Sequence, residues 1–194
     1  MTICYNLPVD NVFSELFLKS KPYRYHKSEI ILRPDDDISH AYYIEKGFVK
    51  IYSLTEDGEE RLHIIYKEGD IFPLIGIFSN LSKNVYYEAL ADVTTRKVFQ
   101  KDFVEFIKKD PNYLIETINK IIEVFNIHVD RIEELQYSKS FPRLIYELIS
   151  LANRFGRQTG SSITITVPLS HKDIASSINL TRETVSREKE KHYY

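Results

Sequence analysis

The sequence predicts an α+β protein with an N-terminal antiparallel β-roll, one long helix and a C-terminal helix-turn-helix. Three observations support this prediction. Short β-type runs broken by turn residues fill Tyr23 to Phe99, a long helical pattern starts at Pro111, and two short capped helices are expected after Leu169. We expect the boundaries of the three parts at residues 1–110, 111–137 and 138–194 of the 194-residue chain.

The β-roll is expected because its apolar runs are short and each one ends at a turn signal. A short amphipathic helix ending near residue 20 precedes them. The clearest strand candidates are four apolar runs, Glu29–Leu32, Ala41–Ile44, Phe48–Leu54 and Arg61–Tyr66. Turn-forming residues separate the runs, at 34–37, 45–47, 56–59 and 68–70. Strands spaced about 8–12 residues apart are typical of an antiparallel roll, barrel or sandwich.

The long helix begins at Asp110-Pro111, where Asp suits the N-cap and Pro the first helical position. Its apolar residues follow a heptad, which predicts pairing with a second copy of the chain. The expected dimer interface comprises the a and d positions, Ile118, Ile121, Phe125, His128, Ile132 and Leu135. The alternative is a helix packed on its own β-roll, for which Ile122 and Val129 beside the seam are available. His128 is interpreted either as an interface histidine or as a ligand or pH sensor.

The C-terminal part begins with a helix over Leu144–Phe155, which ends at Gly156, and an alternating strand follows at Ile163–Val167. The segment from Leu169 to Arg187 then fits a helix-turn-helix position by position. Ser170 and Asp173 form a capping box for its first helix, and Asn179 suits a turn that needs positive φ. Thr181 is expected to cap the second helix, and Val185 to anchor it to the core.

The start of this second helix carries the side chains that we expect to contact DNA. Arg can bind guanine at O6 and N7, and Glu can accept from cytosine N4, when a helix enters the major groove. The predicted DNA-binding set is Ser170, His171, Thr181, Arg182, Glu183, Ser186 and Arg187. Charge supports this prediction, because residues 138–194 carry nine Lys/Arg against five Asp/Glu, whereas the first 137 residues carry 17 against 23. The alternative is an ordinary charged helical face.

Several classes of protein are excluded by composition. Cys4 is the single cysteine, so a disulfide framework and a cysteine-ligated zinc or iron–sulfur site within one chain are not expected. Cys4 is interpreted as a free thiol rather than a redox sensor. No apolar run reaches the length of a membrane span and no signal peptide is visible, so we expect a cytoplasmic protein without a membrane partner. The six histidines are scattered singly and no nucleophile–base arrangement is visible, so neither a catalytic nor a metal site is expected.

The run Arg-Glu-Thr-Val-Ser-Arg at 182–187 resembles the recognition helix of the cyclic-AMP receptor/FNR (CRP/FNR) family of transcription regulators. Other family elements follow in order along essentially the whole chain: residues 42–52, Asp57-Gly58, Glu68-Gly69-Asp70, the long helix and Phe141–Leu144. The resemblance implies a cyclic-nucleotide-binding-like jelly roll, a dimerisation helix and a winged helix-turn-helix. It also implies a homodimer on a palindromic double-stranded operator, and contact with RNA polymerase.

The resemblance further assigns roles within the recognition helix. Glu183 and Arg187 would read a G·A step in each half of the palindrome. Arg182 is typical of the cyclic-AMP receptor branch and Ser186 of the FNR branch, so the outer bases of the half-site stay open.

The expected effector is a small molecule other than cyclic AMP. Members that bind cyclic nucleotides carry a Gly-Glu pair and an Arg-Ser pair, and Pro73-Leu74 and Asn84-Val85 stand at those positions. An iron–sulfur cluster lacks its cysteines, and a haem would need His63 or His128 as axial ligand. The predicted pocket is instead an aromatic cassette, Phe72, Leu74, Phe78, Lys83, Tyr86 and Tyr87. It resembles the chlorophenol-sensing branch and suits a small aromatic or anionic effector; the alternatives are plain β-roll core and a member without an effector.

The resemblance ends after Arg187, where the family continues with leucines and a β-wing. Glu188 and Lys189 stand at the apolar positions, so we expect the recognition helix to lose its inner face and its last turns to fray. The predicted helix-turn-helix is therefore incomplete and lacks its wing. The alternative function is a sensory dimer that no longer binds DNA because its C-terminal module is truncated.

Overall fold

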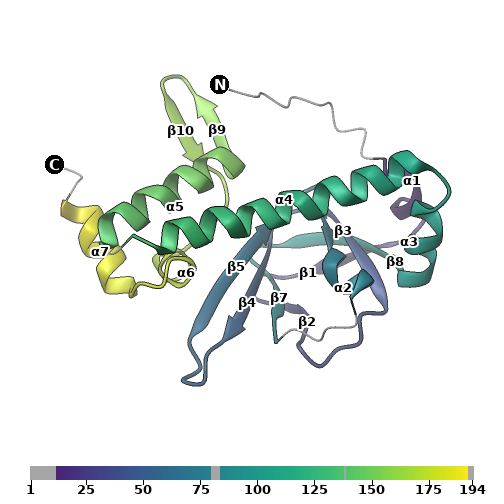
Figure 1. Cartoon of the computed structure of the whole chain (residues 1–194), viewed down its shortest axis with the longest axis horizontal. Coiled ribbons are helices and arrows are strands. Elements are labelled where there is room, and N and C mark those ends of the chain that lie inside the picture. The colour runs from purple at the N-terminus through teal and green to yellow at the C-terminus, as the bar shows by residue number, and fades with distance from the viewer. Residues whose placement is uncertain (1–11, 80–83, 138, 192–194) are drawn as a thin grey trace.

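The computed structural model describes residues 12–79, 84–137 and 139–191, and Figure 1 shows a β-roll crossed by one long helix that leads to a group of C-terminal helices. The roll consists of two four-stranded antiparallel sheets, as the sequence predicts. The first sheet has the order β1 (Pro22–Tyr25), β8 (Val93–Phe99), β3 (His40–Lys46), β6 (Ile71–Phe72). The second sheet, which we call sheet B, has the order β2 (Ile30–Leu32), β7 (Tyr86–Ala89), β4 (Val49–Leu54), β5 (Glu60–Tyr66).

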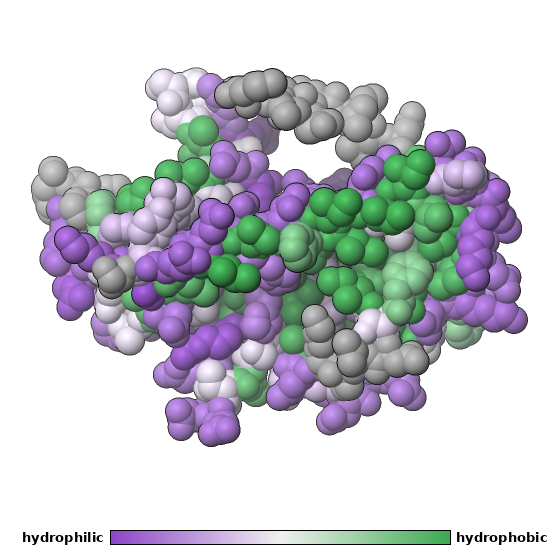
Figure 2. Space-filling model, in the orientation of Figure 1, coloured by the Kyte–Doolittle hydropathy of each residue, from purple (hydrophilic) through white to green (hydrophobic). Residues whose placement is uncertain are grey.

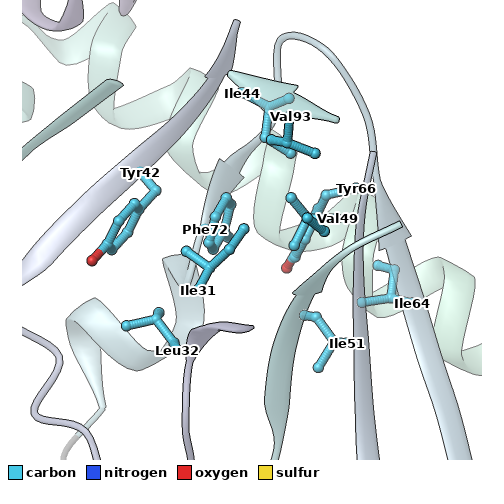
Figure 3. Packing of buried hydrophobic residues seen from close by; sticks show 11 residues of the cluster. Ile31, Leu32, Tyr42, Ile44, Val49, Ile51, Ile64, Tyr66, Phe72 and Val93 are labelled. Carbon is cyan, nitrogen blue, oxygen red and sulfur yellow. The ribbon is translucent and has the colours of Figure 1, made fainter. Parts of the chain in front are cut away.

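The core of the roll lies between the two sheets and is rich in aliphatic and aromatic side chains (Figure 3). Ile44 and Val49 are fully buried there, because alternate residues of a strand face the same side of a sheet. Phe72 is also fully buried, and its ring stacks on those of Tyr42, Tyr66 and Tyr87 with centroids 5.1, 6.0 and 5.4 Å away. This aromatic stack fixes the positions of Tyr66 and Tyr87, which border the cavity described below.

Glycines with positive φ make two of the predicted turns. Gly47 connects β3 to β4 at a φ of +97°, and a Cβ there would lie 2.6 Å from the carbonyl oxygen of Asp92. Gly58 in the β4–β5 hairpin has a φ of +78°. Any other residue would be strained in this region of conformational space.

Helices cover one end of the roll. A cluster of Phe13, Phe17 and Phe103 joins α1 (Ser14–Phe17) to α3 (Gln100–Ile107), and α2 (Leu74–Phe78) follows β6. The long helix α4 spans Pro111–Leu135 and begins as the sequence predicts, because the Asp110 side chain accepts from the Asn112 amide and Pro occupies the first turn. None of the helices in the described ranges combines the length and apolar character needed to cross a bilayer.

The C-terminal part packs against the roll rather than standing free. It contains α5 (Ser140–Phe155), a hairpin of β9 (Gly156–Thr159) and β10 (Ser162–Ile165), α6 (His171–Ser177) and α7 (Arg182–Lys191). The polar residues 157–161, which sequence analysis leaves outside any strand, form much of this hairpin. One core contains Leu62, Ile65 and Leu90 of the roll together with side chains of the C-terminal helices, among them Leu144, Leu151, Ile174 and Val185.

Candidate functional site

Local hydrogen bonds build the helix-turn-helix. At the start of α6 the Ser170 hydroxyl accepts from the Asp173 amide at 3.2 Å, while the Asp173 carboxylate accepts from the Ser170 amide at 2.9 Å, which completes the capping box. Asn179 adopts a φ of +55° in the turn. The Thr181 hydroxyl then accepts from the Thr184 amide at 3.2 Å and caps α7. Side chains that are local in sequence therefore determine the angle between the two helices.

The outer face of α7 is charged and accessible. Arg182, Glu183 and Arg187 are exposed, and the Arg187 side chain keeps 61% of its accessible surface. Val185 on the opposite face is completely buried. Three of the predicted DNA-contacting residues thus lie together on one outward surface of a helix whose inner side is anchored.

The other predicted DNA contacts have structural partners. His171 Nδ1 lies 2.9 Å from the Ser186 hydroxyl, and its Nε2 lies 3.2 Å from Lys189 Nζ. Because an ammonium group only donates, Nε2 accepts and Nδ1 carries the proton donated to Ser186. Ser170 and Thr181 serve as the two helix caps. The structure therefore uses His171 and Ser186 to join α6 to α7, whereas Ser170 and Thr181 each cap one helix.

The expected loss of the inner face of α7 is wrong for the described residues, in which the helix runs to Lys191. Glu188 is only 7% exposed and accepts a hydrogen bond from the Ser140 hydroxyl at 3.3 Å. Lys191 Nζ lies 3.6 Å from the same carboxylate, and Lys189 bonds His171. Polar contacts thus take the place of the apolar ones whose loss the sequence predicts; residues 192–194 lie outside the described part.

Ion pairs connect α6 to sheet B. Lys50 on β4 has a side chain only 8% exposed, and its Nζ lies 3.0 Å from Glu60, 3.3 Å from Glu88 and 3.6 Å from Asp173. Lys172 adds a second link, at 2.9 Å from Glu60. These carboxylates together raise the pKa of Lys50 even though burial alone lowers it. These ion pairs therefore connect Asp173, which belongs to the capping box of α6, to sheet B.

Arg131 of α4 forms a second junction. Its guanidinium donates to the carbonyl oxygens of Leu62 on β5 and Ser177 on α6, at 3.1 and 3.0 Å. The carboxylate of Glu147 on α5 lies 3.3 Å away and also accepts from the Ser177 hydroxyl at 2.7 Å. Glu147 is 1% exposed, so this pair is well shielded from solvent.

Glu134 lies at the same junction and is less well satisfied. It is 5% exposed, and its Oε1 atom has no hydrogen-bond partner. Burial, assisted by the nearby charge of Glu147, raises the pKa of this carboxyl to about 7, against the opposing effect of Arg131 and Arg143.

A cavity of about 660 Å³ opens between the roll and α4. Leu74 and Tyr87 of the predicted pocket lie on its wall, and Lys83 lies outside the described residues. The other three predicted residues do not line it. Phe72 belongs to the core, Phe78 of α2 is 48% exposed, and Tyr86 stacks on Tyr52 with ring centroids 5.2 Å apart.

Sequence analysis missed most of the cavity wall. Tyr86 and Tyr87 are adjacent on β7 and so face opposite sides of sheet B, and only the alternation of its strands distinguishes them. That same alternation would have pointed to Ile51 and Tyr66. The wall also contains His63, His128 and the segment between β2 and β3, residues 33–38. The His63 Nε2 atom lies 2.9 Å from the Ser53 hydroxyl.

The apolar residues exposed along α4 match the predicted dimer interface only in part. At two of the predicted d positions, the next residue along the helix is exposed instead. Ile118, Phe125 and Ile132, the predicted a positions, are 46%, 63% and 61% exposed, and Leu135 is 37% exposed. Ile121 packs into the core beside α3, and His128 borders the cavity. In their place Ile122 and Val129 are exposed, at 49% and 36%. The exposed stripe is therefore 118, 122, 125, 129 and 132, with a spacing of 4-3-4-3, and Leu135 extends it by three further residues.

This stripe forms a continuous apolar band along α4 in the space-filling view (Figure 2). The opposite face of α4, with Val124 and Ile127, packs on the roll. Within the described ranges, no group of three or more His, Cys, Asp or Glu side chains is arranged to hold a metal ion, and Cys4 lies outside those ranges.

Two family models match the chain. A cyclic nucleotide-binding domain covers residues 22–110, and a Crp-like helix-turn-helix domain covers residues 142–190. Their limits coincide with the roll and with the group of helices from α5 to α7.

Known proteins resemble the chain over most of its length. The global nitrogen regulator of Synechococcus elongatus is 28% identical over 84% of this chain and 75% of its own. The structure of FixK2 from Bradyrhizobium japonicum aligns with a TM-score of 0.76 at 23% identity, covering 89% of this chain and 83% of that one. CprK complexed with OCPA aligns with a TM-score of 0.70 at 19% identity, covering 93% and 83%. At such identities the structural likeness shows the fold alone.

The two matched domains follow each other along the chain, and the long helix α4 lies between them. The relatives resemble the chain over most of its length. The chain belongs to the CRP/FNR family of transcription regulators.

Proposed function

We propose that the chain acts as a homodimer that binds a palindromic operator in double-stranded DNA and is controlled by a small molecule other than cyclic AMP. The observation that carries the proposal is the start of α7, where Arg182, Glu183 and Arg187 project from a helix anchored by Val185. Side chains at the N-terminal end of a recognition helix contact base edges when the helix lies in the major groove. RNA polymerase is the expected further partner, and no catalysis is part of the proposal.

A second copy of the chain is the proposed occupant of the α4 stripe. Apolar residues with alternating spacings of three and four follow a heptad seam, which pairs two helices through interdigitating side chains. Ile118, Phe125 and Ile132 would contribute one half of the seam and Ile122 and Val129 the other. Pairing along α4 also places two copies of α7 in one molecule, as a palindromic site requires.

The cavity beneath α4 is the proposed effector site. Leu74 stands where a nucleotide-binding member would carry its carboxylate, and Asn84 where it would carry its Arg. Leu74 contributes an apolar side chain to the wall, and a phosphate buried without a cationic partner would be costly. An FNR-type iron–sulfur cluster is not proposed, because the sequence contains one cysteine. The chlorophenol-sensing branch stays a proposal that rests on the tyrosine-rich character of the site.

The test is a titration of the chain into a fluorescent duplex with two TGTGA-type half-sites and into a scrambled duplex. We expect tighter binding to the palindrome by at least about 100-fold, and weaker binding to both duplexes between roughly 50 and 200 mM salt. Equal affinity for the two duplexes from a chain that is dimeric would favour the alternative, a sensory dimer that does not read DNA.

A pair of variants with the same change of charge assigns the contact. Arg187→Ala removes a proposed base contact and should lower the selectivity by about 1–3 kcal/mol. Arg157→Ala removes the same charge from the hairpin β9–β10, which lies on the other side of α5 from α7 in Figure 1, and should leave selectivity unchanged. Equal losses of selectivity in the two variants would contradict the assignment.

A further inference from the structure

Aliphatic side chains form a large part of the wall of the sensor cavity. Side chains from five different elements and one loop contribute to it, among them Leu32, Ile38, Ile51, Ile64, Leu74 and Val124. A volume of about 660 Å³ lies within the range of about 300–1,000 Å³ that is usual for small-molecule sites. The wall therefore favours a ligand with an apolar body.

Two side chains of the cavity wall, Tyr66 and Tyr87, carry phenol hydroxyls that have no hydrogen-bond partner among the described residues. Tyr66 is only 6% exposed, and no hydrogen bond within the described residues engages its hydroxyl or that of Tyr87. The Tyr66 hydroxyl points toward Ile51 on the cavity side (Figure 3). Burial raises the pKa of both phenols, so both keep the proton that they can donate. Phe72 stacks on both rings and holds them in place.

Charged groups lie at the rim of the cavity rather than inside it. Among the described lining residues the rim carries Arg33 and the three carboxylates of Asp35, Asp36 and Asp37, all exposed. An anion would meet three negative charges against one positive charge there. Deeper in the cavity the described lining holds no carboxylate, ammonium or guanidinium group. Its two imidazoles, His63 and His128, both already take part in other interactions, His63 with the Ser53 hydroxyl at 2.9 Å. An ion of either sign buried there would therefore lack a fixed opposite charge.

Behind Tyr66 a second cavity of about 20 Å³ carries two acidic and two basic residues, Asp70, Glu123, Lys120 and Arg154. Three of these side chains already have backbone partners. Asp70 accepts from the Lys67 amide at 2.8 Å, Lys120 donates to the Gly69 carbonyl at 3.2 Å, and Arg154 donates to the Ile65 carbonyl at 2.7 Å. This balanced group adds no net charge to the effector site.

We propose that the effector is an uncharged small molecule with an apolar body and one hydrogen-bonding group, which the hydroxyls of Tyr66 and Tyr87 bind. This inference rests on the proposed function and narrows it, because it removes the anionic effectors that the sequence left open. The apolar body occupies the aliphatic wall, and the polar group replaces the water that both phenols lose on burial.

Three probes with one ring system and different charges test this inference on the full chain at pH 7. They are 2-naphthylmethanol, which is neutral, 2-naphthoate, an anion, and 2-naphthylmethylammonium, a cation. The chain contains no tryptophan, so naphthalene fluorescence polarisation follows binding without a tryptophan background. We expect the alcohol to bind at least about 10-fold more tightly than either ion, since burying an unpaired charge outweighs one hydrogen bond.

Variants of three tyrosines assign the contact. Tyr66→Phe and Tyr87→Phe should each weaken binding of the alcohol by about 3- to 10-fold, because each removes one hydrogen bond. Tyr86→Phe is the matched control, since it makes the same change at the neighbouring position of β7 outside the cavity wall, and its affinity should equal that of the parent chain. Binding of either ion as tight as that of the alcohol, an equal effect of Tyr86→Phe, or no binding of any probe would overturn the inference.

Duplex titrations on the same preparations separate this inference from the function on which it rests. Selective duplex binding without the expected order of probes would overturn the effector class alone. The expected order of probes without selective duplex binding would support the effector class and count against the regulator.

Discussion

Single residues at the junction of α4, α5 and α6 determine how the C-terminal part sits on the roll. Arg131 donates to carbonyl oxygens of β5 and α6 and pairs with Glu147, which itself accepts from Ser177. Glu134 is the less well satisfied member of this network. Its Oε2 atom lies 3.9 Å from Arg131 Nε, but its Oε1 atom is buried without a hydrogen bond. A buried oxygen without a hydrogen bond destabilises the folded state by about 1–3 kcal/mol. Because the cost is greater for the charged carboxylate, the stability of the protein should depend on the protonation of Glu134.

Glu134 should make the protein less stable as the pH rises. Its pKa in the folded state is about 7, against an ordinary value of 4.5. Between these values the unfolded chain has lost the proton that the folded chain keeps, so the free energy of unfolding falls as the pH rises through this window. Glu134→Gln should abolish this fall and raise the free energy of unfolding at pH 8 by about 1–3 kcal/mol, measured by urea denaturation at pH 5, 6, 7 and 8.

Glu133→Gln is the matched control for this prediction, because it removes the same charge from an exposed position one residue earlier in α4. It should leave the pH profile of the parent chain unchanged. Equal profiles for the two variants would show that the junction does not depend on Glu134.

Among the elements, α4 shows where sequence analysis succeeds and where it fails. The Asp110 cap and the first-turn Pro are predicted correctly, because capping depends on neighbours in the sequence. For the second half of the seam the sequence predicts 121, 128 and 135, whereas the residues exposed on that side are 122, 129 and 135. Adjacent residues at those points are nearly equally suited to burial, and only the three-dimensional packing of the roll decides which of them faces it.

The exposed stripe of α4 should hold the dimer together. Phe125 is its most exposed member, at 63%, and Phe125→Glu places a charge at the centre of the proposed seam. We expect the dimer dissociation constant, measured by sedimentation equilibrium, to rise by at least about 30-fold, which corresponds to the loss of a hot spot of about 2 kcal/mol.

Leu18→Glu is the control for the dimer measurement. Leu18 is 59% exposed just after α1, outside the α4 stripe, so the same change of chemistry there should leave association intact. A parent chain that sediments as a monomer, or a Phe125→Glu variant that associates like the parent, would contradict the proposed interface.

The cavity is a second case in which the sequence pattern predicts only some of the residues. The aromatic run around Phe72 to Tyr87 suggests a pocket, yet only Leu74 and Tyr87 of the predicted set line it. Strand alternation separates Tyr87 from Tyr86, and the pairing of the two sheets places Phe72 in the core. Residues 33–38 line the cavity only because the fold brings this loop next to it. No local sequence pattern therefore predicts their contribution.

For the whole molecule, sheet B is the wall that the two functional parts share. Ile51, Tyr66 and Tyr87 face the cavity. On the same three strands, Lys50 forms ion pairs with Glu60 and Glu88, and it also pairs with Asp173 of α6. A ligand in the cavity and the orientation of α6 therefore depend on one sheet. The overall architecture could be predicted from the sequence because turns, caps and the recognition motif are local; the contacts between parts could not, because their residues are far apart in the chain.

Two duplexes with identical half-sites show whether two copies of α7 bind one operator together. In one, two TGTGA-type half-sites are centred one helical turn apart; in the other, about 5 base pairs are inserted between them, which turns one half-site to the opposite face of the DNA. A dimer joined along α4 with two copies of α7 should lose at least about 100-fold in affinity for the second duplex and bind the first with two chains per duplex. Equal affinity for both duplexes, or one chain per duplex, would contradict the account.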